Sequence, residues 1–490
     1  MPQYFMGIDL GTSSVRAGIF HEDGSRLAIS ARAYPIETPV PGASLQDPEL
    51  WWSRTCEAIA EALTLSELNG SDISGISFCG QMHGAVLLDS SNNPVSPAII
   101  WADSRCAAEC EEITEILGQH VLRDTLMNRI FPGTQAAIIH WLRKHELQTW
   151  QRVRRILLPK DYLRFRMCGL FHSEPSDASA TLLFDQNQRD WSTEVLKKLG
   201  IPVEFLPYIV ASDQVIAETE GIEECTGIPE GVPLVLGGSD QAAAALGNAV
   251  LDEGVMFIAV GTGGQIVTPL RSPRTSPGLC LNTFCHLPES RWYLMGATLA
   301  AGLSLRWFRE TFALQASFSD LDQEAALISP GCDGLRFDPY IAGKRSPVMD
   351  PSAGGCFTGI RLNHTRGHFA RAVLEGVAFD LRDSLEVILK MDIRPHTVIL
   401  SGGGAKSPLW PQILSDVFNL PLTFSASDEQ ACFGTALLAG VGVGAYSDYW
   451  RAAELVPKPS RIVEPESDTV SRYEEIYCSR EQCGKEETTC

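Results

Sequence analysis

Two carboxylates stand at the ends of short apolar stretches, each beside glycine and hydroxyl residues. Asp9 follows the stretch 4–8 and precedes a Leu-Gly-Thr-Ser-Ser segment, whose backbone N–H groups and hydroxyls could cradle a phosphate while the carboxylate orients a hydrated Mg²⁺. Asp240 follows Gly237-Gly-Ser and opens the very apolar stretch 241–246. A carboxylate placed there can accept a proton from a substrate hydroxyl. Taken alone, the first motif fits an ordinary hairpin turn equally well, and Asp240 fits a plain helix N-cap.

Two further glycine-rich turns could hold a phosphorylated ligand through backbone atoms. Gly261-Thr-Gly-Gly264 follows the apolar stretch 255–260 and resembles the first turn without its carboxylate. The segment 401–410 contains three consecutive glycines, which let a backbone lie flat against a planar or phosphorylated ligand. The helix expected from about Pro408 would point its N-terminus at that ligand. A hairpin is the alternative interpretation of the turn at 261–264.

The polar turn Gly80-Gln-Met-His-Gly84 follows the strand-like stretch 73–79. A Gln and a His flanked by glycines suit hydrogen bonding to a polyol, although a lone His is more often structural. The chain lacks the patterns of a Rossmann dinucleotide site, a P-loop, a zinc protease and an α/β-hydrolase nucleophile. The glycine turns and the two carboxylates are therefore the best candidates for a site.

The elements that carry these turns are predicted to repeat along the chain. The chain opens with a strand, turn, strand pattern that the stretch 255–268 repeats, so Thr12 and Thr262 lie 250 residues apart, about half the chain. The stretches 76–80 and 398–404 are also alike, since each is a short apolar strand that ends in a glycine turn. These echoes are short, but they suggest two related α/β domains that face each other across a cleft, where ligands tend to bind.

Composition excludes several classes of protein. The 490 residues are 44% hydrophobic and 20% charged, which indicates a globular chain of two or three folding units. The net charge of −21 argues against non-specific binding to nucleic acid or to an anionic membrane. Glycines interrupt the best candidate for a membrane span, at 436–445, and the N-terminus does not resemble a signal peptide. The 14 cysteines show no zinc spacing, so reduced thiols in a cytoplasmic protein are expected.

Taken together, the motifs resemble the FGGY family of carbohydrate kinases, within the actin, hexokinase and Hsp70 superfamily. The resemblance runs from Gly7 to about Tyr446, and the Gln-Met-His-Gly and Leu-Pro-Lys-Asp-Tyr-Leu strings discriminate best. The strings that carry it lie at 7–13, 80–85, 99–105, 158–163, 238–240 and 401–410. It implies an α/β fold with two actin-like (ribonuclease H-like) ATPase domains facing a central cleft. The implied division is a sugar-binding and catalytic domain at 1–248, a nucleotide-binding domain at 249–450, and a C-terminal helix and charged tail at 451–490.

The resemblance also implies a role for each matching residue. Asp240 would be the general base that deprotonates the attacking hydroxyl, and Asp9 would act with it in positioning Mg²⁺. The sugar would be held by Met82, His83, Asp240 and Gln241. The phosphates of ATP would lie along Thr12, Ser13, Thr262 and Gly263. The adenosine portion would lie against Gly403 and Gly404, with Trp307 as a wall of its pocket.

The implied reaction is ATP-dependent phosphorylation of D-xylulose to D-xylulose 5-phosphate. The expected partners are a ketopentose and ATP, with no nucleic acid and no membrane, and a homodimer is the assembly considered. Gln241 departs from the Asn that many relatives carry after the catalytic Asp, so L-xylulose, ribulose, gluconate and glycerol stay open as acceptors. A nucleotide-gated binding protein on the same scaffold is the alternative of a different class, and the retained Asp240 disfavours it.

Overall fold

The computed structural model of the chain describes residues 2–426, 428–458 and 461–486, and it contains two large mixed sheets. In the first sheet the strands lie in the order β13-β14-β5-β1-β2-β3, and β15 pairs with the end of β5. These strands are β1 (Tyr4–Leu10), β2 (Ser14–His21), β3 (Arg26–Ala33), β5 (Ile73–Gly80), β13 (Val215–Glu218), β14 (Pro233–Val235) and β15 (Gly238–Ser239).

The second sheet has the order β18-β19-β17-β16-β22-β23-β24. Its strands are β16 (Val255–Val260), β17 (Gly264–Leu270), β18 (Asn282–Cys285), β19 (Trp292–Thr298), β22 (Thr397–Ser401), β23 (Leu422–Phe424) and β24 (Ile462–Val463). Smaller pairs complete the strands: β4 (Leu45–Gln46) with β7 (Ala98–Ile99), β6 (Val86–Leu88) with β8 (Arg155–Leu157), β9 (His172–Ser173) with β12 (Tyr208–Ile209), β10 (Phe184–Asp185) with β11 (Asp190–Trp191), and β20 (Arg336–Asp338) with β21 (Cys356–Thr358).

The two sheets repeat one topology. In the first, β1 pairs antiparallel with β2 and parallel with β5, and in the second, β16 pairs antiparallel with β17 and parallel with β22. The similar sequence patterns in the two halves therefore belong to equivalent strands, and the turn after β1 corresponds to the turn after β16. The prediction of an α/β fold built from two related, actin-like halves is confirmed.

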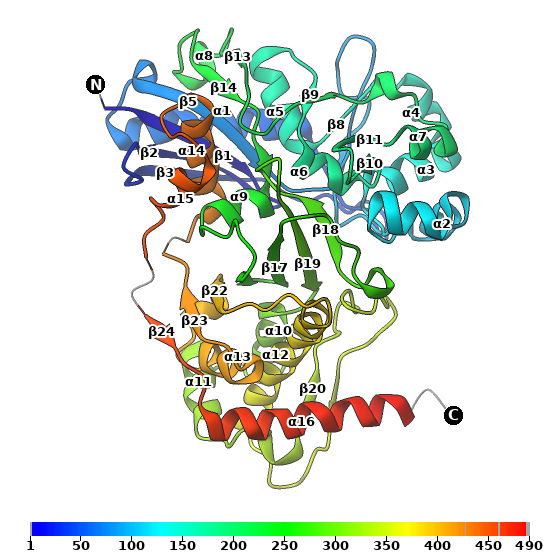
Figure 1. Cartoon of the computed structure of the whole chain (residues 1–490), viewed down its shortest axis with the longest axis vertical. Coiled ribbons are helices and arrows are strands. Elements are labelled where there is room, and N and C mark those ends of the chain that lie inside the picture. The colour runs from blue at the N-terminus through cyan, green and yellow to red at the C-terminus, as the bar shows by residue number, and fades with distance from the viewer. Residues whose placement is uncertain (1, 427, 459–460, 487–490) are drawn as a thin grey trace.

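Helices cover both sheets and lie between them, as Figure 1 shows. Those of the first half are α1 (Pro48–Ser66), α2 (Ala107–Val121), α3 (Gln135–His145), α4 (Leu147–Arg152), α5 (Pro159–Cys168), α6 (Pro175–Ala178), α7 (Thr193–Leu199), α8 (Glu223–Thr226) and α9 (Asp240–Leu246). Those of the second half are α10 (Gly302–Phe312), α11 (Phe318–Ala326), α12 (Arg366–Lys390), α13 (Trp410–Phe418), α14 (Gln430–Gly442), α15 (Tyr449–Ala453) and α16 (Ser467–Glu486).

Helix α14 comes late in the chain but packs on the first sheet, against β1 and β5, and beside α9 (Figure 1). Its buried side chains join those of α9 and of both sheets in one apolar cluster. The glycine-interrupted run expected not to span a membrane forms part of this buried helix. None of the helices in the described part of the chain is long and apolar enough to cross a membrane.

Glycine allows α14 and α9 to approach each other. A Cβ on Gly434 would lie 1.9 Å from the carbonyl oxygen of Ala243, and one on Gly247 would lie 2.1 Å from that of Gln430. Both distances are far below van der Waals contact, so the helices pack backbone to backbone at this crossing. The position of α9, whose first residue is Asp240, therefore depends on these glycines.

We expect Gly434→Ala to lower the free energy of unfolding by about 1–3 kcal/mol, because overpacking forces the backbone to move. It should also lower kcat, since α9 carries Asp240. Urea unfolding and steady-state kinetics measure the two effects. Gly354→Ala is the matched control, because a Cβ there meets no atom within 4 Å. Equal stability of the two variants would contradict the packing argument.

Candidate active site

The two sequence-predicted carboxylates lie at the same edge of the first sheet. Asp9 is paired with Cys79 across the parallel strands β1 and β5, and Gly238 of β15 is paired with Cys79 from the other side. Neighbouring strands lie about 4.8 Å apart, so the ends of β1, β5 and β15 lie side by side. Asp240 follows β15 directly. The fold thus brings together two acids that are 231 positions apart in the sequence.

Asp240 occupies the first turn of α9, where Ser239 caps the helix by accepting a hydrogen bond from the Ala242 N–H at 3.4 Å. Its Oδ1 is buried and accepts no hydrogen bond from any described residue. Burial, and then the negative charge of Asp9, raise the pKa of Asp240 from 3.8 to about 7. A carboxyl group with this pKa and a free oxygen can accept a proton near neutral pH.

Asp9 is buried beside a single cation. Arg16 lies 3.7 Å from its carboxylate, and the Cys79 thiol donates to its Oδ1 at 3.5 Å. Burial raises the pKa of Asp9, while Arg16 and the Cys79 thiol act in the opposite direction. Because Asp9 and Asp240 repel each other, a divalent cation near both would be stabilised. Mg²⁺ is commonly held by one or two carboxylates together with substrate phosphates, so this pair suits it. Within the described residues no group of three or more His, Cys, Asp or Glu side chains forms a metal site by itself.

His83 is held in a neutral form. It has a positive φ of 74°, is 5% exposed, and its Nδ1 lies 2.7 Å from the carbonyl oxygen of Ala180. Burial, and then the positive charge of Arg345, lower the pKa of His83 to about 3. Since only a protonated Nδ1 can donate to a carbonyl, this contact assigns the proton to Nδ1 and leaves Nε2 as an acceptor. The ring can therefore accept a hydrogen bond from a hydroxyl.

Five of the predicted residues line one cavity of about 130 Å³. They are Thr12, Met82, His83, Asp240 and Gln241. The same cavity is lined by Gln81, which the sequence predicted to bond a polyol together with His83, and by five residues without a predicted role, Trp101, Gln265, Met295, Ala297 and Arg345. Trp101 stands inside the string at 99–105 that carries part of the resemblance, so that string was the available signal for it. The four residues from the second half of the chain had no comparable signal.

The polar groups of this cavity are positioned by their neighbours. The indole N–H of Trp101 donates to the hydroxyl of Thr12 at 2.9 Å, and the Gln81 amide donates to Gln46 at 2.9 Å. One amide oxygen on Gln81 and one on Gln241 are buried without a hydrogen-bond donor among the described residues. Buried acceptors without a donor are costly, so a ligand with several hydroxyl groups would satisfy them.

The remaining predicted residues lie outside this cavity. Ser13 and Thr262 are exposed, and the Thr262 carbonyl accepts the backbone N–H groups of Ala301 and Leu303, both at 3.0 Å. This contact joins the turn at 261–264 to the start of α10.

The triple-glycine segment lies beside that turn. A Cβ on Gly402 would lie 3.2 Å from the Gly261 nitrogen and one on Gly404 would lie 2.5 Å from Val260, whereas one on Gly403 would meet no atom within 4 Å. The structure thus brings together two of the predicted glycine turns and leaves Gly403 with open space in front of it. Trp307 stacks on Phe337, with ring centroids 6.2 Å apart, and packs against the core of the second half.

A fully buried ionic cluster lies behind α9. The Lys160 ammonium lies 2.8, 3.4 and 3.5 Å from the carboxylates of Asp161, Glu174 and Asp177, all at 0% exposure. Burial raises the pKa of Asp177 well above its ordinary value. Glu174 accepts from Ser176, whose hydroxyl in turn accepts the Ser239 N–H at 2.9 Å. Part of the Leu-Pro-Lys-Asp-Tyr-Leu string thus supports the residue before Asp240 rather than lining the cavity.

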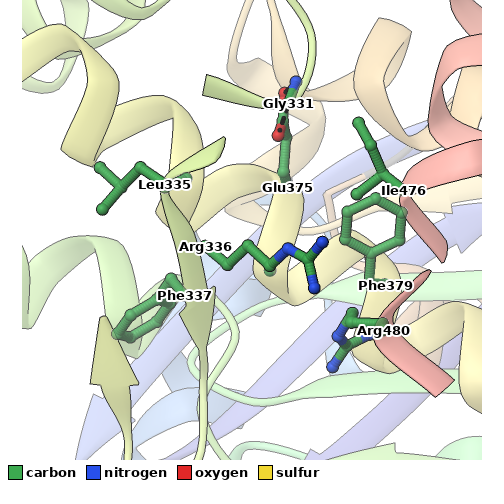
Figure 2. A pocket seen from close by; sticks show the side chains of 10 residues that line it. Gly331, Leu335, Arg336, Phe337, Glu375, Phe379, Ile476 and Arg480 are labelled. Carbon is green, nitrogen blue, oxygen red and sulfur yellow. Dashed lines mark hydrogen bonds between the residues drawn. The ribbon is translucent and has the colours of Figure 1, made fainter. Parts of the chain in front are cut away.

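A second, much smaller cavity lies between α12, β20 and α16, as Figure 2 shows. Its volume is about 20 Å³, which is room for about one water molecule. Glu375 at its wall accepts hydrogen bonds from Arg371 at 2.7 Å and from the Tyr473 hydroxyl at 2.8 Å. These contacts tie α16 to α12, and the cavity is too small for a sugar or a nucleotide.

Comparison with known proteins supports one family for the whole chain. The model of the N-terminal domain of the FGGY family of carbohydrate kinases matches residues 4–247, and that of its C-terminal domain matches residues 256–443. A xylulose kinase of Bacillus subtilis (strain 168) is 35% identical over 476 residues, 97% of this chain and 95% of the relative. A gluconokinase of the same organism is 28% identical over 486 residues, 96% of this chain and 94% of the relative. A crystal structure of a xyloylose kinase from Brucella ovis has a TM-score of 0.91 and 30% identity, covering 98% of each chain.

Proposed function

The chain belongs to the FGGY family of carbohydrate kinases, and we propose that it transfers a phosphoryl group from ATP to the terminal hydroxyl of D-xylulose, giving D-xylulose 5-phosphate. One observation carries the proposal. A buried carboxylate with a free oxygen, Asp240, lines the same cavity as the neutral imidazole of His83 and the amide of Gln241.

In the proposed reaction Asp240 accepts the proton of the attacking hydroxyl. His83 Nε2 and the amide oxygen of Gln241 accept hydrogen bonds from other hydroxyls and so orient the sugar. Phosphoryl transfer depends on positioning and on charge neutralisation rather than on covalent help from the protein. Mg²⁺, when it is bound with the nucleotide, neutralises charge on the phosphates, and Asp9 and Asp240 are the residues that would hold it.

The nucleotide is proposed to lie along the glycine turns. Thr12, Ser13, Thr262 and Gly263 would face its phosphates through hydroxyl and backbone N–H groups, and Gly403 and Gly404 would face the adenosine portion. The division at 1–248, 249–450 and 451–490 stays a prediction, as do the adenosine-wall role of Trp307, the homodimer and the cytoplasmic location. Because α14 comes from the second half of the chain but packs on the first sheet, the two proposed halves share one buried apolar cluster.

A coupled ADP-release assay with Mg·ATP tests the acceptor. D-Xylulose is expected to give the highest sugar-dependent rate among D-xylulose, L-xylulose, ribulose, gluconate and glycerol. A higher kcat/KM for one of the others would keep the kinase assignment and reject D-xylulose. Gluconate is the second candidate, because a guanidinium lies in the cavity and a gluconokinase is among the relatives.

The raised pKa of Asp240 predicts a pH profile. Only ionised Asp240 accepts a proton, so kcat/KM for the sugar should fall about tenfold per pH unit below about pH 7 and level off above it. In Asp9→Asn the pH at which the rate falls should be lower, because the negative neighbour that raises the pKa is gone. Rates measured from about pH 5.5 to 8.5 test both statements. A profile that is flat over this range would contradict the assignment of Asp240 as the base.

A further inference from the structure

Arg345 reaches the sugar cavity from the second half of the chain. It stands in the segment Ala342-Gly-Lys-Arg-Ser346, which lies outside the two sheets. The Ser346 N–H donates to the Ala297 carbonyl at 3.1 Å, and the Ala297 N–H donates to the Ser346 hydroxyl at 3.2 Å. This exchange fixes the segment to the end of β19. As a result Arg345 lines the same cavity as His83 and Asp240.

The positive charge of Arg345 has no carboxylate partner within ion-pair distance among the described residues. Its guanidinium lies 5.0 Å above the ring of Phe131. Burial, and then the positive charge of Arg129, lower the pKa of Arg345 to about 10. Arg129 is itself bonded to the carbonyls of Leu279 and Pro347, at 3.0 and 2.9 Å. Partly buried cations normally have anionic or hydrogen-bonding partners, so the partner missing here is one that a ligand can supply.

The surroundings of Arg345 identify which ligand that is. Its neighbours Phe131 and His83 are in edge-to-face contact, with ring centroids 5.2 Å apart, and both belong to the first half of the chain. Arg345 and Asp240 both line this cavity, and among the described residues no ion pair joins the guanidinium to the carboxylate. A linear acceptor with its reacting hydroxyl at Asp240 could therefore place another part of its carbon chain beside Arg345.

We propose that Arg345 is a specificity-determining residue that binds a carboxylate or carbonyl oxygen of the acceptor, at a part of its carbon chain other than the reacting hydroxyl. The assignment rests on the proposed function only for the placement of that hydroxyl at Asp240. A guanidinium pairs with a carboxylate through two parallel hydrogen bonds, with a carbonyl through fewer, and with a hydroxyl most weakly. The cavity should therefore bind five-carbon ligands in the order sugar acid, ketose, alditol.

Calorimetric titration without nucleotide tests this order with D-xylonate, D-xylulose and xylitol. The native protein is expected to bind D-xylonate about tenfold more tightly than xylitol, and Arg345→Gln to lose that preference while its affinity for xylitol changes less than about threefold. Arg345→Lys should keep part of the preference, since it retains the charge but not the planar fork. Arg309→Gln is the matched control, because Arg309 also lies over a ring, that of Phe318 at 4.4 Å, but does not line the cavity. An unchanged ratio of D-xylonate to xylitol affinity in Arg345→Gln would overturn the proposal.

Thermal unfolding separates a binding role from a structural one. Removing a cation without a carboxylate partner should leave the Tm of the unliganded protein unchanged or raise it. A lower Tm together with equal weakening of all three ligands would make Arg345 structural and reject the subsite. The proposed function is tested by a different result. Absence of ADP release with D-xylulose would reject D-xylulose as the acceptor. A preference for D-xylonate that depends on Arg345 would still support the subsite in that case.

Discussion

Asp240→Asn is expected to lower kcat for sugar phosphorylation by about 100- to 10,000-fold, because an amide cannot accept the proton of the attacking hydroxyl. The fold should not weaken. The folded-state pKa of Asp240, about 7, lies above its ordinary value of 3.8, so the ionised form opposes folding as pH rises from about 4 to about 7. Replacement by a neutral amide removes that opposition. Urea unfolding near pH 8 should therefore show equal or greater stability, alongside the loss of ADP release.

Asp322→Asn is the matched control for this substitution. Asp322 is a buried carboxyl whose pKa is also raised by burial, but it accepts a hydrogen bond from Ser407 and does not line the sugar cavity. The kcat of this variant should remain within about twofold of the native value. An amide oxygen at position 322 still accepts the Ser407 hydroxyl, and this side chain does not line the sugar cavity. Near-normal turnover in Asp240→Asn would remove Asp240 from the role of base.

Lys160→Met is expected to lower the free energy of unfolding by about 3–5 kcal/mol, because it removes the cation shared by three fully buried acids. Asp161 keeps its ion pair with Arg164 at 2.8 Å, so the loss falls on Glu174 and Asp177. The substitution should also lower kcat, since Ser176 links this cluster to the residue before Asp240. Urea or guanidinium unfolding measures the first effect and the coupled assay the second.

Lys198→Met makes the same substitution at an exposed pair. Lys198 lies 3.0 Å from Glu194 on α7, and such surface pairs contribute about 0–1 kcal/mol. A loss of stability in Lys160→Met no larger than that in Lys198→Met would mean that the buried acids become neutral at little cost. The cluster would then have no part in holding α9.

Much of the fold could be predicted because the same local pattern of strands and glycine turns occurs in both halves of the sequence. Strand, Gly-Thr turn and strand occur at both β1–β2 and β16–β17. Of the equivalent strands β5 and β22, the first ends in Gly80 and the second is followed directly by Gly402. The start of α1 is also predictable from the sequence, since Pro48 occupies its first position and the side chain of Asp47 accepts the Glu49 N–H. Local patterns of this kind are set by backbone chemistry, which a sequence displays directly.

The rest depends on contacts between distant segments. Arg345 follows a Gly-Lys pair that matches no motif, and only the hydrogen bonds between Ser346 and Ala297 bring it to the cavity. The apolar run at 436–445 gave no sign that its helix would pack on the first sheet instead of the second. The buried ion pair of Lys160 and Asp161 could not be predicted either, because two adjacent charged residues in a sequence do not indicate that their side chains are buried.

Identification of the product shows whether this chain phosphorylates the terminal C5 hydroxyl of D-xylulose. The protein is incubated with Mg·ATP and ¹³C-labelled D-xylulose, and phosphorus-to-carbon coupling in the NMR spectrum locates the new phosphate ester. Coupling is expected at C5, with one ADP released for each ester formed. ADP release without a sugar phosphate, or an ester at another carbon, would contradict the proposed reaction.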